Sequence, residues 1–163
     1  MGTVYRYGSW LPMVISVIGT GSCNKKIYKT AEKVGTLIAQ RNAVLVSGGL
    51  GGVMEAASKG AREAGGITVG ILPGFTKDDA NKYVTIPITT GLSHARNIIV
   101  VRSADAVIAV SGEYGTLSEI AIALKLGKPV IGIQTWGNIE GVISVNSAEE
   151  AVNKAFELAG KTK

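Results

Sequence analysis

The chain contains very little cysteine and histidine, which limits the chemistry that it can perform. Among its 163 residues there is one cysteine, Cys23, and one histidine. One cysteine cannot close a disulfide within the chain, and one cysteine with one histidine is a poor basis for a zinc site made of protein ligands alone. We therefore expect no metal, no required cofactor and a reducing, cytoplasmic setting.

Long apolar runs are also missing. A membrane-spanning helix needs about 20 consecutive apolar residues, and no segment of this sequence approaches that length. The run from Trp10 to Ile18 is interrupted by Pro12 and has only Arg6 as a basic flank, so it does not fit a signal peptide. We expect a soluble protein that is not exported and has no membrane partner.

The excess of positive charge is modest. Seventeen Lys and Arg against twelve Asp and Glu give a net charge of +5, which is compatible with a nucleic-acid partner or with a preference for anionic ligands. Because the basic residues are scattered rather than interleaved with aromatic residues, the sequence disfavours a nucleic-acid surface.

What the chain has in abundance is short runs rich in Val and Ile, separated by helical patterns. The predicted strands are Met13–Ile18, Ala43–Ser47, Ile67–Leu72, Ala106–Val110, Pro129–Ile133 and a weaker one at Val142–Val145. The predicted helices are Lys25–Arg41, Gly52–Ala64, Ser93–Ser103, Gly115–Leu126 and Ser147–Ala159. Strands that are apolar on both faces and alternate with helices form parallel sheets covered on both sides. The sequence thus predicts an α/β fold with a doubly wound, Rossmann-like parallel sheet in three layers, α/β/α, with residues 1–163 as one domain and residues 1–11 peripheral.

The alternation is interrupted at Pro73–Gly91, which is polar and has no long periodic segment. Ligands of such folds bind beyond the carboxyl ends of the strands, so this segment is either a lid or rim of the site or an ordinary crossover with a short strand at Tyr83–Ile86.

The predicted helix Ser93–Ser103 carries Ile98 to Val101 in succession, which places apolar side chains around nearly its whole circumference. A helix of this kind is buried on more than one side, whereas the outer side of a helix in a three-layer fold meets water. We therefore expect a homodimer, or a multiple of one, with Ile98–Val101 and parts of Ile120–Leu124 at the interface.

Two glycine-rich turns each connect a predicted strand to a predicted helix. The first is Gly48-Gly49-Leu50-Gly51-Gly52 and the second lies in Ser111–Glu119. Glycines there let the backbone turn sharply and leave N–H groups bare at a helix N-terminus, where an anion is favoured. Since a tight reversal alone needs only one or two glycines, the first turn favours a ligand that approaches the backbone closely.

We therefore expect a small phosphorylated ligand, a nucleotide or a phosphate, at the carboxyl edge of the sheet. The residues predicted to bind it are Gly19, Gly21, Ser22, Gly48, Gly49, Gly51, Gly52, Val53, Met54, Gly112, Tyr114, Gly115 and Thr116. NAD is disfavoured, because Asn24 replaces the third glycine of the dinucleotide fingerprint and Ser47 replaces the acidic residue that binds the ribose diol. A P-loop motif is absent from the sequence.

The second turn can be interpreted in two ways. Thr116 and Glu119 have the spacing of a capping box, in which the hydroxyl and the carboxylate bond to the first amides of the helix. Alternatively, the carboxylate of Glu119 stands beside the bound phosphoribosyl group.

At these two turns the chain resembles the Lonely Guy family of nucleotide-binding proteins, which are also called possible lysine decarboxylases and are related to the molybdenum-cofactor carrier proteins. The family motif GG-x-GG-[VL]-M is matched at Gly48–Met54, and P-G-G-x-G-T-x-x-E is matched at Gly112, Gly115, Thr116 and Glu119. The similarity covers about Met13 to Ile133.

This resemblance implies a nucleotide-binding protein with the activity of a nucleoside 5′-monophosphate phosphoribohydrolase. Arg96 and Glu119 match the family's catalytic arginine and glutamate, while Asn97, Ser111 and Glu113 depart from its motifs. A carboxylate stabilises the positive charge that develops on the ribose during N-glycosidic cleavage, and an arginine can hold phosphate or sugar oxygens.

Two other functions remain open. The carrier branch implies a non-catalytic protein that holds molybdenum cofactor or a similar phosphorylated pterin. The stretch Ser47–Gly74 also resembles the DNA-processing protein A family, which implies a DNA-binding module. Lysine decarboxylation is not expected, because no lysine stands in a context typical of a pyridoxal-phosphate anchor.

Overall fold

The computed structural model describes residues 11–161 of the chain. Apart from Leu11, the segment that the sequence predicts to be peripheral lies outside these residues. Leu11 itself is 44% exposed.

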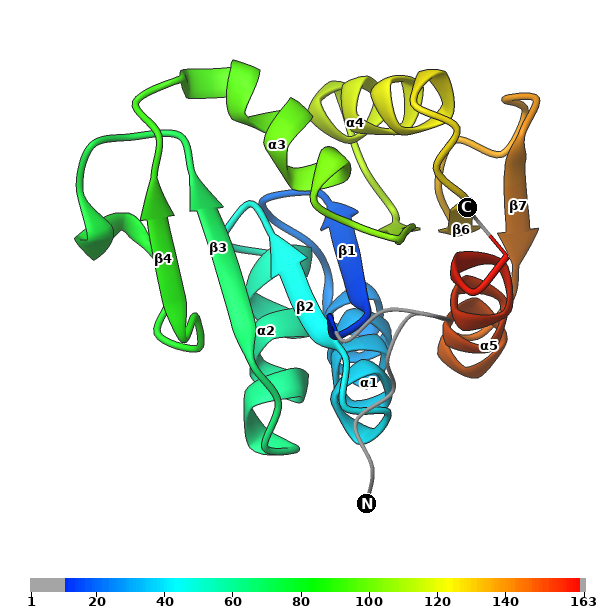
Figure 1. The fold of residues 1–163 in the computed structure, drawn as a ribbon, viewed down its shortest axis with the longest axis horizontal. Coiled ribbons are helices and arrows are strands. Elements are labelled where there is room, and N and C mark those ends of the chain that lie inside the picture. Colours follow the sequence, from blue (N-terminus) through cyan, green and yellow to red (C-terminus); the bar gives the residue numbers. More distant parts are fainter. Residues whose placement is uncertain (1–10, 162–163) are drawn as a thin grey trace.

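Within the described residues, seven strands form one parallel sheet and five α-helices connect them (Figure 1). The strands are β1 (Val14–Gly19), β2 (Val44–Ser47), β3 (Thr68–Leu72), β4 (Ile86–Thr89), β5 (Ala106–Val110), β6 (Val130–Ile133) and β7 (Val142–Val145). The helices are α1 (Lys25–Gln40), α2 (Val53–Glu63), α3 (Asn97–Arg102), α4 (Tyr114–Lys125) and α5 (Ala148–Ala159), with short 3-10 helices η1 (Lys77–Asp79) and η2 (Ser93–Arg96).

The order of the strands, β4-β3-β2-β1-β5-β6-β7, reverses direction between β1 and β5. All neighbouring strands are parallel, and β1 and β5 pair from Ile15 with Ala106 to Gly19 with Val110. In a doubly wound sheet, the carboxyl ends of the strands at such a reversal border a crevice in which ligands bind.

Two apolar clusters cover the two faces of this sheet. One contains residues of α1, α2 and α5, and the other contains residues of α3 and α4. Residues of β5 contribute to both clusters, since all five of its residues are buried. The predicted three-layer α/β/α fold is confirmed.

The Pro73–Gly91 segment contains an edge strand, but the strand lies three residues later than the Tyr83–Ile86 predicted from the sequence. The hydroxyl of Thr68 donates a hydrogen bond to the carbonyl oxygen of Tyr83 at 2.7 Å, which holds Tyr83 in a turn. Pairing with β3 therefore begins only at Ile86. Pro87 is tolerated there because an edge strand can lack one ladder N–H.

The predicted helix Ser93–Ser103 is also shorter than expected. Its first four residues form the 3-10 helix η2, which starts from Ser93 with a positive φ of 52°, and α3 begins only at Asn97. Val100 and Val101 are fully buried inside their own chain, so their burial does not require a second subunit. Val100 and Val101 therefore do not lie at a subunit interface, contrary to the prediction from the sequence.

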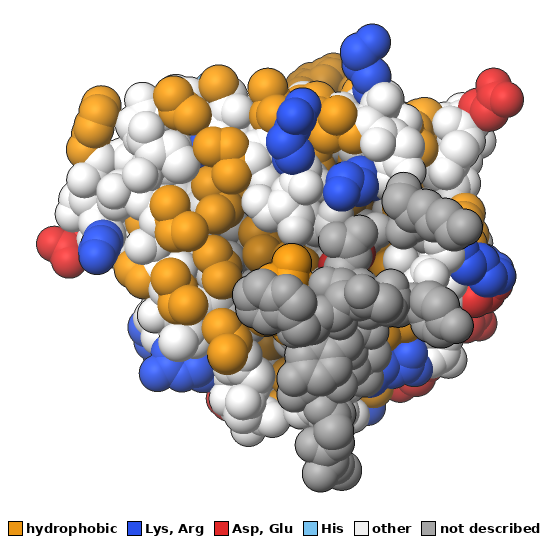
Figure 2. All heavy atoms as spheres, viewed as in Figure 1, with side chains coloured by type: hydrophobic (Ala, Val, Ile, Leu, Met, Phe, Trp, Pro, Cys, Tyr) orange, Lys and Arg blue, Asp and Glu red, His pale blue; other side chains and the backbone are white. Residues whose placement is uncertain are grey.

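Other apolar side chains remain at the surface on this face of the sheet. Figure 2 shows hydrophobic atoms gathered over β3 and β4. Ile86 and Ile88 of β4 are 46% and 44% exposed, and Ile98 of α3 is 43% exposed. No helix in the described part of the chain is long and apolar enough to cross a membrane.

Candidate functional site

A cavity of about 210 Å³ lies at the carboxyl ends of β1 and β5, where the strand order reverses. Three segments that are far apart in the sequence form most of its wall: the β1–α1 turn, η2 with the start of α3, and the first turns of α4. Gly48, which begins the first glycine-rich turn, and Met54, the second residue of α2, complete the wall of the cavity.

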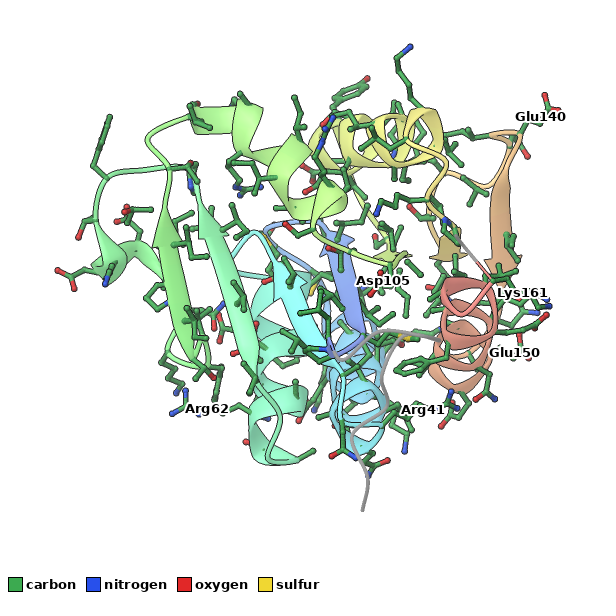
Figure 3. All side chains as sticks on the ribbon, in the orientation of Figure 1. Arg41, Arg62, Asp105, Glu140, Glu150 and Lys161 are labelled. Atoms are coloured by element: carbon green, nitrogen blue, oxygen red, sulfur yellow. The ribbon has the colours of Figure 1, made fainter. Side chains whose placement is uncertain are left out.

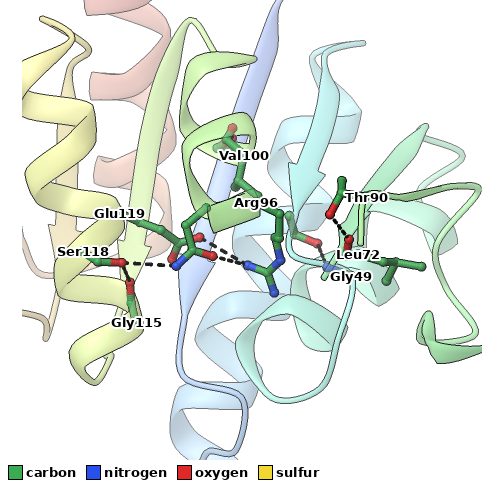
Figure 4. A network of polar contacts seen from close by, with 11 residues as sticks. Gly49, Leu72, Thr90, Arg96, Val100, Gly115, Ser118 and Glu119 are labelled. Carbon is green, nitrogen blue, oxygen red and sulfur yellow. Dashed lines mark hydrogen bonds and ion pairs between the residues drawn. The ribbon is translucent and has the colours of Figure 1, made fainter. Parts of the chain in front are cut away.

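Arg96 and Glu119 face each other in this cavity (Figure 4). Nη1 of Arg96 lies 3.8 Å from Oε1 of Glu119, and the two residues are only 8% and 6% exposed. Arg96 ends η2, and Glu119 lies in the second turn of α4. The fold thus brings together the two residues that the sequence predicts to be catalytic.

The alternative interpretation of Glu119 as part of a capping box is wrong. Helix α4 begins at Tyr114 with Glu113 as its N-cap residue, and no side chain caps it. Thr116 is therefore the third residue of the helix rather than its cap. Since Glu119 lies one turn further along, its carboxyl group is directed to the cavity and not to the helix terminus.

Burial determines the ionisation of this pair. Desolvation raises the pKa of Glu119 to about 8, and the nearby positive charge of Arg96 only partly opposes this effect. Burial also lowers the pKa of Arg96, while Glu119 raises it. Glu119 is therefore largely protonated at pH 7, and Arg96 carries the positive charge of the cavity.

A chain of hydrogen bonds connects Arg96 to the start of α4. Nη1 of Arg96 donates to Oδ1 of Asn97, and Nδ2 of Asn97 donates to Oγ of Ser118 at 3.2 Å. The Ser118 hydroxyl in turn donates to the carbonyl oxygen of Gly115 at 2.6 Å. These bonds leave Nε of Arg96 buried and without a partner among the described residues, a state that costs free energy until an acceptor arrives.

The second glycine-rich turn presents open backbone to the cavity. A Cβ on Gly115 would meet no atom within 4 Å, and Gly115 and Thr116 both line the cavity at the uncapped N-terminus of α4. Gly112 has a φ of 134°, and a Cβ there would lie 2.5 Å from Cβ of Thr116, so only glycine suits this position. Tyr114 points outward and is 81% exposed. Backbone amides at the uncapped start of a helix, together with the helix dipole, favour an anion.

The first glycine-rich turn packs closely against the β1–α1 turn. A Cβ on Gly52 would lie 2.3 Å from the carbonyl oxygen of Thr20, and one on Gly51 would lie 3.0 Å from that of Gly21. The amide of Val53 already donates to the carbonyl of Thr20 at 3.0 Å. These close contacts are made by the β1–α1 turn of the same chain, so they account for the glycines without a ligand.

Gly49 is held in the same way. Its amide donates to Oγ of Ser47, and its φ of 74° brings it against β3. Asn81 fastens the turn from the other side, with Nδ2 donating to the carbonyl oxygens of Gly49 and Leu50 at 3.2 and 2.9 Å. None of the described residues of Pro73–Gly91 lines the cavity, so the segment supports the turn rather than covering the site.

Gly19, the last residue of β1, lines the cavity together with Thr20 and Gly21 of the β1–α1 turn. Ser22 lines a second cavity next to it. A Cβ on Gly19 would lie 2.4 Å from the carbonyl oxygen of Val110, so glycine lets β1 approach β5 at the floor of the site.

Several residues of the site were not among the predicted binding residues. Ile18, His94, Asn97 and Glu113 line the main cavity, as does Thr20. His94 stands two residues before Arg96, which is the one sequence signal that could have suggested it. Within the described part of the chain, no three His, Cys, Asp or Glu residues are grouped so that they could hold a metal ion.

Comparisons with known proteins identify relatives of this chain. Residues 12–160 match the SLOG cluster4 family. An uncharacterized protein of Archaeoglobus fulgidus is 52% identical over 91% of this chain and 98% of its own length. A cytokinin riboside 5′-monophosphate phosphoribohydrolase of Mycobacterium tuberculosis is 32% identical over 72% of this chain and 67% of its own length. These relatives confirm the resemblance that the two turns indicate.

Solved structures show the same fold. The molybdenum cofactor binding protein of the phototrophic bacterium Rippkaea orientalis has a TM-score of 0.87 and 39% identity, over 91% of this chain and 98% of that protein. DNA processing protein A of Streptococcus pneumoniae has a TM-score of 0.72 at 23% identity, over 87% of this chain and 61% of that protein. The second similarity shows the fold alone.

Proposed function

Because the chain belongs to the SLOG cluster4 family, we propose that its cavity binds a nucleoside 5′-monophosphate and hydrolyses it to a free base and ribose 5-phosphate. The observation that carries this proposal is the buried pair of Arg96 and Glu119 beside the uncapped N-terminus of α4. The hydrolase of M. tuberculosis, with 32% identity, supports the same activity.

The geometry suits each part of such a ligand. The amides of Gly115 and Thr116 and the dipole of α4 bind the phosphate, and Arg96 holds phosphate or sugar oxygens. Water supplies the oxygen that joins C1′ of the ribose as the bond to the base nitrogen breaks, and the base leaves with a proton. Positive charge develops on the ribose during this step, and the ionised form of Glu119, a minority at pH 7 that grows as the pH approaches 8, stabilises it.

The decisive experiment incubates the purified protein with AMP, GMP, IMP, CMP and UMP and measures released base by chromatography. Adenosine serves as the matched substrate without phosphate. We expect base from at least one monophosphate and much less from the nucleoside. If the wild type releases no base from any of them, the hydrolase assignment is overturned.

A non-catalytic carrier of molybdenum cofactor, or of a similar phosphorylated pterin, is the second candidate. It is supported by the similarity to the R. orientalis protein, which extends over 98% of that protein at 39% identity. A carrier needs the anion site of α4 but not turnover. Binding of AMP without base release from any monophosphate would therefore favour this candidate.

We also propose that the protein forms a homodimer, or a multiple of one. Ile88 pairs with Ile71, which belongs to the apolar cluster under α3, so exposed Ile88 and exposed Ile98 share one face of the sheet. Apolar side chains exposed on one face are typical of a protein–protein interface. Sedimentation at micromolar concentration should show a dimer, and Ile98→Lys should weaken it. A monomeric wild type would refute this proposal.

A further inference from the structure

Glu113 lies at the boundary between the main cavity and a second one. The second cavity, of about 330 Å³, shares Glu113 and Thr20 with the main cavity. Its other polar residues include Ser22, Asn24 and Ser111. A ligand whose phosphate lies at the start of α4 can therefore extend past Glu113 into a polar space.

Positive charge is scarce along this path. Arg96 is the one Lys or Arg among the described residues that line the main cavity, and none lines the second cavity. The start of α4 adds about half a unit of positive charge. One guanidinium and the start of α4 suit a single phosphate group. A second phosphate past Glu113 would meet only the start of α1 at Asn24, whose partial positive charge is much weaker than that of a Lys or Arg side chain.

The carboxylate of Glu113 is free to act on whatever enters this space. Glu113 is exposed, and among the described residues its carboxylate has no hydrogen bond or ion pair. Its backbone is fixed, because its carbonyl oxygen accepts from the amide of Leu117 at 2.9 Å and from Nε1 of Trp136 at 3.3 Å. The side chain therefore projects from a rigid point between the two cavities.

We propose that Glu113 is a specificity-determining residue. It admits ligands with one phosphate in which the part next to Glu113 is uncharged and donates hydrogen bonds. It rejects ligands that bring a second phosphate to this point. This inference rests on the proposed function, since it assumes that a nucleotide phosphate occupies the start of α4. A carboxylate repels a second phosphate through space, whereas it accepts hydrogen bonds from N–H groups of a heterocycle.

The test measures the affinities of AMP and ADP by calorimetry for the wild type, Glu113→Gln and Glu140→Gln. Glutamine keeps the shape of glutamate and removes only its charge. Glu140 is exposed in the β6–β7 loop at the outer edge of the molecule (Figure 3), so its substitution changes the net charge equally without touching either cavity.

We expect the wild type to prefer AMP to ADP by about tenfold or more, and Glu113→Gln to reduce this preference by about tenfold, chiefly through tighter ADP binding. Glu140→Gln should leave the preference unchanged. Raising the salt from about 50 to about 500 mM should narrow the wild-type preference, because salt screens an exposed charge.

The results distinguish a failure of nucleotide binding from a failure of the role of Glu113. If the wild type binds neither nucleotide, the proposed function fails. If it binds AMP, but binds ADP equally well or keeps its preference in Glu113→Gln, the role of Glu113 is refuted while nucleotide binding stands. An equal effect of Glu140→Gln would also refute it, because net charge would then account for the change.

Discussion

Gly48 leaves room for the guanidinium group of Arg96. A Cβ at residue 48 would lie 2.7 Å from Nη2 of Arg96 and 2.7 Å from Sδ of Met54. The first glycine of the GG-x-GG turn is thus required by a side chain that arrives from η2, about fifty positions along the chain. This contact ties the glycine-rich turn after β2 to the pair of Arg96 and Glu119.

Gly48→Ala should therefore damage the site more than the fold. The atoms that its methyl group meets are the far ends of flexible side chains, which can move aside at small cost in stability. Displacement of the guanidinium by a fraction of an ångström or more should lower base release by about 10- to 100-fold. Turnover and thermal unfolding are the measurements.

Gly160→Ala is the matched control, since its Cβ would make an ordinary contact at 3.6 Å and its φ is −69°. A fall in stability of Gly48→Ala large enough to account for the lost activity would contradict the specific role of this contact.

Glu119→Gln should abolish base release while AMP binding is largely kept. The amide has the shape of the protonated carboxyl group that predominates at pH 7, but it cannot take a negative charge to stabilise the transition state. We expect a loss of about 10²- to 10³-fold in kcat. Single-turnover assays and calorimetry with AMP measure the two properties, and a parallel loss of both would argue against a role in the transition state.

The rate of base release should depend on pH through the same group. If the ionised form of Glu119 is the active one, kcat/KM rises with pH. It reaches half of its maximum near pH 8, which is the pKa that burial gives this carboxyl group. The profile is measured with AMP between about pH 6 and pH 9.5. A rate that falls through this range would instead identify the protonated form as the active one.

Burial of Glu119 should also make the protein less stable as the pH rises. The folded chain keeps this proton up to about pH 8, whereas an unfolded chain releases it near the ordinary value of 4.5. Between these limits the folded state binds more protons, so the free energy of unfolding falls by up to about 1.4 kcal/mol per pH unit. The stabilising contribution of protonated Glu119 is complete below about pH 4.5 and is lost above about pH 8.

Urea denaturation of the wild type and Glu119→Gln at pH 5, 6.5 and 8 isolates this effect, because the other ionisable groups are common to both. We expect the wild type to lose stability relative to the variant as the pH increases. A constant difference between the two proteins would show that Glu119 ionises normally.

Arg96→Ala should weaken both binding and turnover, in contrast to Glu119→Gln. It removes the one cationic side chain of the described cavity wall, and a hydrogen bond to a charged group contributes about 1.5–3 kcal/mol, or about 10- to 100-fold in affinity for AMP. Arg96→Lys restores the charge but not the planar fork, so we expect only partial recovery. Full activity in Arg96→Lys would show that charge alone suffices.

Much of the fold follows from local sequence patterns. The all-apolar run Ala106–Val110 predicted a strand buried on both faces, and the structure has β5 at the same residues. The start of α5 was predicted equally well, because Ser147 caps that helix through its side chain. Such signals lie within a few residues of each other and need no knowledge of the rest of the chain.

The boundaries that failed depend on distant partners. The register of β4 is determined by pairing with β3 and by the bond from Thr68 to the turn at Tyr83, neither of which leaves a local pattern. The first helical residues after Ser93 form η2 instead of α-helix, and the positive φ of Ser93 is not visible in the sequence. Similarly, the burial of Val100 and Val101 by their own chain depends on how α3 packs against the sheet.

For the site, the sequence by itself determined which residue types are present, and the tertiary structure decided what each of them does. The T-x-x-E spacing fits a capping box and a catalytic glutamate equally, and only the start of α4 at Tyr114 assigns Glu119 to the cavity. The glycines at Gly51 and Gly52 predicted a ligand, whereas the close contact is made by the β1–α1 turn. A sequence records that an atom must approach the backbone closely, but the identity of that atom is decided by the packing of segments that are remote along the chain.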